Sequence, residues 1–182
     1  MADQGSEGLL SPFLRERRLA AARQHLRGRV LDLGCGGGLL AQWVEPADYL
    51  GFDVDPASLA AARQAFRHHR FTADFPNTQR FDTVVALAVI EHLPEPWRHL
   101  AQWRSLLAEG GRLVLTTPHP SVDMVHTLGA RLGIFSRHAS EEHQDLLDHA
   151  GLVQAAGRGG LSVELYRRFL LGANQLAVLR AA

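Results

Sequence analysis

Short apolar runs alternate with helix-like segments through the first two thirds of the chain, and this alternation most constrains the fold. The apolar runs lie at 30–33, 49–54, 69–73, 81–88 and 112–116. Helical patterns lie before and between them, at 11–26, 39–44, 56–66 and 95–108. Strands that are apolar on both faces and separated by helices are typical of a parallel sheet covered on both sides.

The C-terminal part of the chain follows a different pattern. A helix is predicted from Ser140 to His149, and glycines are expected to break the stretch after it, at 150–151 and 157–160. Two further apolar runs follow at 161–170 and 175–180, separated by a glycine-containing turn that indicates an antiparallel hairpin.

These patterns together predict a doubly wound α/β fold. Its sheet is expected to be mostly parallel and seven-stranded, and to end in an antiparallel hairpin. The predicted domain covers residues 11–182 as one unit. Residues 1–10 are polar and contain glycine, so a flexible tail is expected there.

A glycine-rich string joins the first predicted strand to the following helix. It reads Val-Leu-Asp-Leu-Gly-Cys-Gly-Gly-Gly over residues 30–38, with glycines at alternate positions 34, 36 and 38. Such glycines let the backbone turn sharply and approach a ligand closely, and N–H groups at the helix start would face that ligand. A dinucleotide fingerprint would need a third glycine where Leu39 or Ala41 stands, so the glycines alone leave the cofactor open.

Three carboxylates end three successive strands. Asp32 lies at the end of the first strand, Asp53 at the end of the second and Asp74 at the end of the third. Asp53 follows the first glycine at the spacing at which an acid reaches ribose hydroxyls. The carboxyl ends of parallel strands meet at one edge, so the three acids should converge on one crevice. That crevice favours a nucleoside with a positive charge and no phosphates.

Composition excludes several kinds of chemistry. The 19 basic residues are all arginine, so a lysine Schiff base, a P-loop lysine and a Tyr-x-x-x-Lys dyad are excluded. They balance 19 acidic residues, which argues against nucleic acid or an anionic membrane as the main partner but leaves room for a local basic patch. Cys35 is the single cysteine, which excludes an internal disulfide and a cysteine-rich zinc site.

The motifs resemble those of class I S-adenosylmethionine-dependent methyltransferases of the small-molecule kind (type 11/12-like). VLDLGCGGG (30–38) resembles the first motif of that family, D/E-x-G-x-G-x-G, and YLGFDVDP (49–56) resembles the second. FTADF (71–75), FDTVVALAVIEHLPEP (81–96) and GGRLVLTTPHP (110–120) resemble the motifs of the third, fourth and fifth strands. All five follow in order across roughly 26–120.

The resemblance implies a Rossmann-like methyltransferase fold with S-adenosylmethionine as cofactor. It assigns cofactor contacts to the glycine string, at Asp32, Gly34, Cys35, Gly36 and Gly38. It places Asp53 with Val54 at the ribose, and Asp74 with Phe75 at the adenine. It also implies that the backbone of Ala88 faces the amino acid part of the cofactor and that Arg18 binds the carboxylate of the cofactor. The thiol of Cys35 is interpreted as a small buried filler.

Methyl transfer from a sulfonium is an in-line displacement, for which alignment can supply most of the catalysis. A hydroxyl acceptor would also gain from a general base. His92 and His119 follow the fourth and fifth strands and are the candidates. His119 also begins a pattern with Asp123 and His126, but that pattern is a weak signal and no metal site is predicted.

The segment from Ser121 to Glu142 is expected by analogy to shape the acceptor site. It lacks the aromatic-interleaved basic stretch of a nucleic-acid binder, so the predicted acceptor is a small or lipid-linked molecule and no nucleic acid. The reaction is predicted to be O-methylation by a cytoplasmic monomer or homodimer, without stable membrane insertion. Three alternatives stay open: an NAD-dependent oxidoreductase, a non-catalytic cofactor-binding subunit and a transferase that uses a related sulfonium.

Overall fold

The computed structural model describes residues 11–121 and 147–182. Seven strands form one sheet: β1 (Val30–Leu33), β2 (Tyr49–Phe52), β3 (Arg70–Thr72), β4 (Phe81–Leu87), β5 (Leu107–Pro118), β6 (Leu161–Phe169) and β7 (Asn174–Ala181). Their order in the sheet is β3-β2-β1-β4-β5-β7-β6. The first five strands are parallel, and β7 runs antiparallel to both β5 and β6. The predicted doubly wound sheet with its C-terminal hairpin is confirmed.

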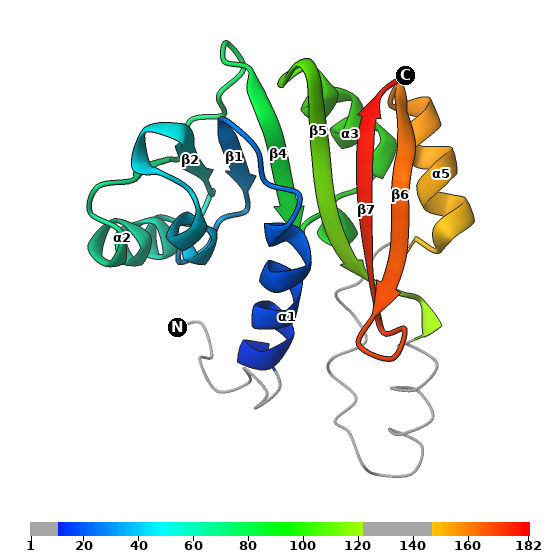
Figure 1. The fold of residues 1–182 in the computed structure, drawn as a ribbon, viewed down its shortest axis with the longest axis horizontal. Coiled ribbons are helices and arrows are strands. Elements are labelled where there is room, and N and C mark those ends of the chain that lie inside the picture. The colour runs from blue at the N-terminus through cyan, green and yellow to red at the C-terminus, as the bar shows by residue number, and fades with distance from the viewer. Residues whose placement is uncertain (1–10, 122–146) are drawn as a thin grey trace, which may run out of the picture.

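Helices cover both faces of the sheet (Figure 1). The α-helices are α1 (Ser11–Arg23), α2 (Pro56–Ala65), α3 (Pro96–Arg104) and α5 (His149–Arg158), and the short 3₁₀ helices are η1 (Leu39–Trp43), η2 (Pro46–Asp48) and η3 (Ile90–His92). Buried residues of α1, η1 and α2 pack with Val30 and Val85 on one face. Buried residues of α3 and α5 pack with Leu31 and Leu113 on the other.

The carboxyl ends of β1 to β5 lie at one edge of the sheet, the lower edge in Figure 1. The strand order reverses between β1 and β4, because the chain builds β2 and β3 on one side of β1 and β4 and β5 on the other. Ligands of open α/β sheets bind at such a switch point, outside the carboxyl ends of the strands. The start of α1 extends below this edge (Figure 1).

The fourth helix and fifth strand differ from the prediction of a helix over 95–108. α3 ends at Arg104, and β5 begins at Leu107. Gly110 has φ +69° and lies inside β5, where the pairing with β4 shifts register between Phe81 and Thr83. The glycine pair therefore forms a bulge within the strand and does not end a helix.

α5 also differs from the prediction. Residues 140–146 of the predicted helix lie outside the described part, and α5 begins only at His149. The carboxylate of Asp148 caps it by accepting the N–H of Gly151 at 2.8 Å. Leu152 and Ala156 are buried against the sheet, and this packing outweighs the cost of about 1 kcal/mol for a glycine in a helix. The predicted break at 150–151 is wrong, and the second break falls at Gly159.

Other predictions concern residues that the structure does not describe. These are the tail at 1–10, most of the acceptor segment at 121–142, and Asp123 and His126. In the ranges that are described, no helix combines the length and apolar character needed to cross a bilayer.

Candidate functional site

The glycine loop turns at the end of β1, and most of its N–H groups donate hydrogen bonds to other residues of the protein. Gly34 N and Cys35 N both donate to the carbonyl oxygen of Phe52, at 2.8 and 3.0 Å, and Gly38 N donates to Cys35 O at 2.9 Å. A phosphate cradle needs such N–H groups to point at the ligand. The geometry of this loop therefore suits a ligand without phosphates, as the three carboxylates predict.

The three alternate glycines all have positive φ, but they face different surroundings. A Cβ on Gly34 would lie 2.6 Å from Val89 Cγ2, and a Cβ on Gly38 would lie 2.7 Å from Phe71 Cε1. A Cβ on Gly36 would meet no atom within 4 Å among the residues that the structure describes. The first and third glycines are therefore required by packing, whereas the middle one borders open space.

Asp53 is fixed at the mouth of this loop. Its Oδ2 accepts the N–H of Gly36 at 2.8 Å, and its Oδ1 accepts the N–H of Asp55 at 2.9 Å. Asp55 itself caps α2 through Ala57 N and Ser58 N. Asp53 is therefore not needed as the helix cap, and its half-buried carboxylate stands beside Val54, an apolar side chain that is 79% exposed.

Asp32 lies under the loop and not in the open crevice. It is buried and accepts a hydrogen bond from the hydroxyl of Tyr49 at 2.8 Å. Burial raises the pKa of Asp32 to about 7, the nearby charge of Asp53 adds to this, and the Tyr49 hydrogen bond opposes it. Burial likewise raises the pKa of the Cys35 thiol, which keeps this sulfur unreactive as predicted for a filler.

The end of β3 holds the third carboxylate. Asp74 is exposed. Its backbone N–H donates a hydrogen bond to the hydroxyl oxygen of Thr72 at 2.9 Å, which fixes the turn. Phe75 packs edge-on against Phe52 with ring centroids 5.4 Å apart, as part of the core on the α3 side. Phe75 therefore belongs to the core here, and only its remaining half-exposed surface borders the crevice.

A second cluster of polar side chains lies where α1 meets the ends of β4, β5 and β7. We call it the Arg18 cluster (Arg18, Glu91, Thr117 and Asn174). Arg18 Nε donates to Asn174 Oδ1 at 2.8 Å. Burial raises the pKa of Glu91, against a backbone hydrogen bond and the influence of Thr117 and Arg18. Glu91 Oε2 and Thr117 Oγ1 are buried, and neither makes a hydrogen bond to the described chain.

Buried polar atoms without partners are rare in folded proteins, so these two atoms call for a partner such as a bound water or a ligand. Sequence reasoning selected Arg18 but missed Thr117 and Asn174. Only the sheet order brings these two beside α1, because Asn174 pairs with Pro118 across β7 and β5. Glu91 had a local signal, since it stands in the Glu-His-Leu that follows the strongest predicted strand.

The chain turns sharply after β4. Ala88 has φ +56°, which is unusual for a residue with a side chain, and its N–H donates to Thr116 O at 2.8 Å. Strained backbone of this kind costs on the order of 1–3 kcal/mol and is common at ligand sites. His92 follows on η3 as an exposed side chain next to Glu91.

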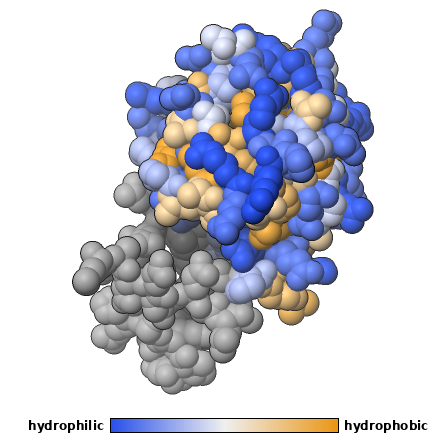
Figure 2. Space-filling model, turned by 90° about the vertical axis from the view of Figure 1, so that its left-hand side faces the viewer, coloured by the Kyte–Doolittle hydropathy of each residue, from blue (hydrophilic) through white to orange (hydrophobic). Residues whose placement is uncertain are grey.

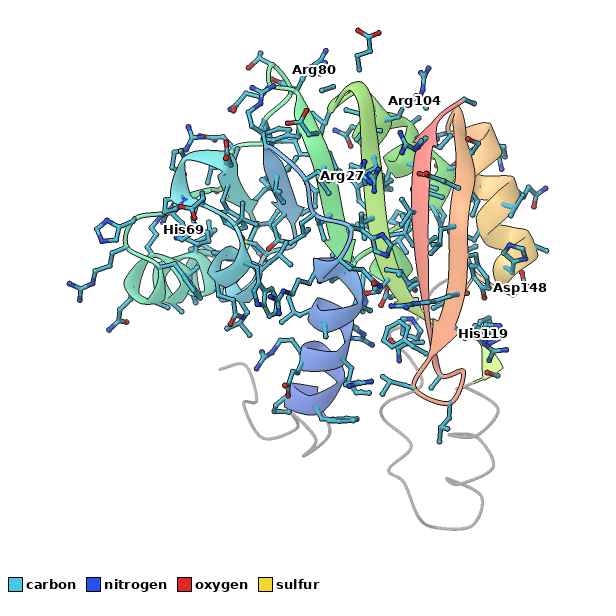
Figure 3. The ribbon with its side chains drawn as sticks, viewed as in Figure 1. Arg27, His69, Arg80, Arg104, His119 and Asp148 are labelled. Carbon is cyan, nitrogen blue, oxygen red and sulfur yellow. The ribbon has the colours of Figure 1, made fainter. Side chains whose placement is uncertain are left out.

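His119 lies near the tip of the β6–β7 hairpin (Figure 3). Its Nδ1 accepts the backbone N–H of Ser121 at 3.1 Å and faces the Ser121 hydroxyl at 2.9 Å, while Arg168 donates to that hydroxyl at 2.8 Å. Nδ1 is thus an acceptor, and the neutral ring carries its proton on Nε2. Burial and Arg168 lower the pKa of His119. The lone pair that a general base needs is therefore already occupied.

No group of three or more histidine, cysteine or acidic side chains within 11–121 and 147–182 is arranged to hold a metal ion. The protein residues do fit the predicted cofactor. The space beside Gly36 and the unpaired oxygen of Glu91 lie at the same edge of the sheet, and Asp53 stands at that edge between them and β3.

Comparison with known proteins agrees with this geometry. Curated relatives include ubiquinone biosynthesis O-methyltransferases from Cereibacter sphaeroides (35% identical over 113 residues) and Coxiella burnetii (29% over 104 residues). The first match covers 56% of this chain and 46% of the relative, and the second covers 50% and 44%. The chain therefore matches less than half the length of these relatives.

Solved structures share the fold at low sequence identity. Magnesium protoporphyrin IX methyltransferase from Synechocystis, with bound S-adenosylhomocysteine, superposes with a TM-score of 0.68 at 18% identity, over 94% of this chain and 83% of that one. A putative methyltransferase in complex with the Trm112 activator of Haloferax volcanii gives 0.72 at 17% identity, over 93% and 92%.

The profile of the methyltransferase domain family matches residues 8–165, which is most of the chain. The strand order and the antiparallel hairpin have the arrangement that the resemblance implied, whereas Asp32 is buried beneath the loop and does not join Asp53 and Asp74 in an open crevice. The chain belongs to the methyltransferase domain family.

Proposed function

We propose that this protein transfers the methyl group of S-adenosylmethionine to a hydroxyl of a small or lipid-linked acceptor. The observation that carries this proposal is the placement of Asp53. The backbone N–H groups of Gly36 and Asp55 hold its carboxylate next to the glycine loop, beside the exposed Val54. A carboxylate held in this way is suited to accept both hydroxyls of a ribose.

In this proposal, the other site residues contact different parts of the cofactor. Asp53 and Val54 lie on the ribose side and Asp74 on the adenine side, and the Arg18 cluster binds the amino acid end. The guanidinium of Arg18 would bind the α-carboxylate, and the partnerless oxygen of Glu91 would accept from the ammonium. Asp32 lies beneath the loop, where it is hydrogen-bonded to Tyr49.

The cofactor supplies an activated methyl group, and the chain's own residues hold the reacting atoms in line. Alignment of this kind is worth up to roughly 7–11 kcal/mol in good intramolecular reactions. A hydroxyl acceptor must also lose a proton. We propose His92 as the group that takes it, because it lies on η3 just after the end of β4. His119 is less suited, since Ser121 occupies its Nδ1.

The name of the curated relatives supports the choice of a hydroxyl acceptor, since they are O-methyltransferases. The loop supports a cofactor without phosphates, because its N–H groups are bound by Phe52, Asp53 and Cys35. This counts against the NAD-dependent alternative. A cytoplasmic location and a monomeric or homodimeric state stay predictions.

Calorimetric titration with S-adenosylhomocysteine tests the cofactor site, with NADH as the competing candidate. Gly36→Ala adds a methyl group that meets no atom of residues 11–121 and 147–182, so a loss of binding beyond that of the control reports on the ligand. Gly110→Ala is the matched control, because Gly110 also has positive φ and open surroundings but lies in β5. We expect Gly36→Ala to weaken binding at least tenfold and Gly110→Ala to leave it unchanged. Binding of NADH alone, or of neither compound, would overturn the proposal.

A further inference from the structure

A basic pocket lies at the outer edge of the sheet, where α2 meets the edge strand β3. Its volume is about 560 Å³. It is lined by Leu50, Arg63, Arg67, His69, Arg70, Phe71 and Thr72. None of these residues is among those assigned to the cofactor, so the pocket is a separate feature of the molecule.

The charge of this pocket is of one sign. No acidic residue lies between Asp55 and Asp74, whereas that stretch carries three arginines and two histidines. In the described part of the chain, the ion pairs are Arg98–Glu95 and Arg180–Glu164, so no carboxylate pairs with the pocket arginines. The chain as a whole has zero net charge, and the pocket therefore concentrates cations that the sequence balances elsewhere.

Two of the basic side chains are held in place. Arg63 Nη2 donates to the carbonyl oxygen of Phe71 at 2.9 Å, which leaves its other N–H groups for a ligand. The ring of His69 donates from Nε2 to Val44 O at 2.9 Å and packs edge-on against Tyr49. Side chains fixed before binding lose little conformational freedom when a ligand arrives.

Charged side chains on an edge strand can also serve to prevent pairing with other chains, which is an alternative explanation for the arginines of this pocket. Arg63 fits this alternative, because it covers the carbonyl oxygen of Phe71 on β3. The alternative does not explain why the charges surround a hollow with an apolar floor of Leu50 and Phe71. Figure 2 faces this side of the molecule, and it shows hydrophilic side chains crossing a partly apolar surface.

We propose that this pocket binds the phosphate group of an anionic ligand. A guanidinium group can bind two phosphate oxygens at once, and Arg67 and Arg70 are exposed residues that line the pocket. The apolar floor favours a phosphate that is carried on an apolar body. A phosphorylated small molecule and a phospholipid headgroup share this chemistry.

The test is titration of the full chain with pyrophosphate by calorimetry, and flotation with phosphatidylglycerol vesicles against phosphatidylcholine vesicles. The pocket variant is Arg67→Gln with Arg70→Gln, which keeps Arg63 and its contact with Phe71. The control is Arg80→Gln with Arg104→Gln, which removes the same charge at sites remote from His69 (Figure 3). Both double variants should bind S-adenosylhomocysteine as the wild type does, which shows that they fold.

We expect the pocket variant to weaken pyrophosphate binding or vesicle binding at least tenfold, and the control to change either by less than twofold. Loss of pyrophosphate binding identifies a soluble phosphate ligand. Loss confined to phosphatidylglycerol vesicles identifies a headgroup. Absence of both interactions in the wild type, or equal losses in the two variants, overturns the proposal.

Discussion

The Nε–H of Arg18 donates to Asn174 Oδ1 across 2.8 Å, and this hydrogen bond joins the first helix to the last strand. Burial lowers the pKa of Arg18, while the charge of Glu91 raises it. The guanidinium thus stays charged, in an orientation that Asn174 sets. The hairpin at the end of the sheet therefore supports a residue on the opposite end of the chain.

Asn174→Ala should release Arg18 from this orientation. If Arg18 binds the α-carboxylate of the cofactor, the variant weakens S-adenosylhomocysteine binding by several-fold. It leaves 5′-methylthioadenosine binding unchanged, because that compound has no carboxylate. Asn174→Asp should weaken S-adenosylhomocysteine further, since the new carboxylate neutralises Arg18. Calorimetry with both ligands separates the cases, and equal losses for the two compounds would refute this role.

The raised pKa of Asp32 predicts that the stability of the protein depends on pH. The pKa of Asp32 rises from 3.8 to about 7 on folding, so the folded state favours the protonated carboxyl. Its contribution is fully present below about pH 4 and is lost as pH rises to about 7, by roughly 1.4 kcal/mol for each pH unit in that window. Asp32→Asn keeps the acceptor for Tyr49 but cannot ionise. It should flatten this part of the profile in urea denaturation between pH 4 and 8.

Tyr49→Phe supplies the comparison for that measurement. The hydroxyl of Tyr49 lowers the pKa of Asp32 by donating to the charged form. Removing it should move the loss of stability toward higher pH, whereas the Asn variant should show no such loss. A wild-type profile identical to that of Asp32→Asn would mean that Asp32 ionises as easily in the fold as in the unfolded chain.

His119 should titrate below its ordinary pKa of 6.5, because burial and the charge of Arg168 disfavour the imidazolium. Nitrogen chemical shifts should identify the neutral ring as the Nε2–H tautomer. Arg168→Gln removes the charge and should raise the pKa toward 6.5. An Nδ1–H tautomer would contradict the hydrogen bond from Ser121 N and restore His119 as a candidate base.

Local sequence signals predicted the parts of this protein that depend on local geometry. The alternation of apolar runs predicted the sheet, and the glycines at 34, 36 and 38 predicted a sharp turn, which the structure makes with positive φ at all three. The order of the carboxylates predicted that Asp53 and Asp74 end neighbouring strands. Each of these follows from a spacing of a few residues.

Contacts over long separations were outside the reach of such patterns. The bulge at Gly110 depends on the pairing of β5 with β4, and α5 forms through two glycines because Leu152 is buried against the sheet. Asn174 gave no signal of its own, since it meets Arg18 only after the hairpin has paired with β5. Turn glycines and helix-breaking glycines look alike in sequence until the surrounding packing is known.

Gly34 offers a test of how tightly packing constrains the loop. Gly34→Ala would place its Cβ 2.6 Å from Val89 Cγ2 and would also force alanine to φ +67°. Overpacking costs typically 1–3 kcal/mol, and the positive φ adds about 1–2 kcal/mol. We expect Gly34→Ala to lower the free energy of unfolding by more than Gly36→Ala, whose Cβ meets open space.

Val89→Ala separates the two costs, because it removes the methyl group that the new Cβ would strike. In a double-mutant cycle measured by urea denaturation, Val89→Ala should recover the packing part of the loss and leave the backbone part, which Gly36→Ala and Gly110→Ala report alone. Additive effects of the two substitutions would show that the loop moves away from Val89. In that case φ alone, and not the contact with η3, would explain glycine at position 34.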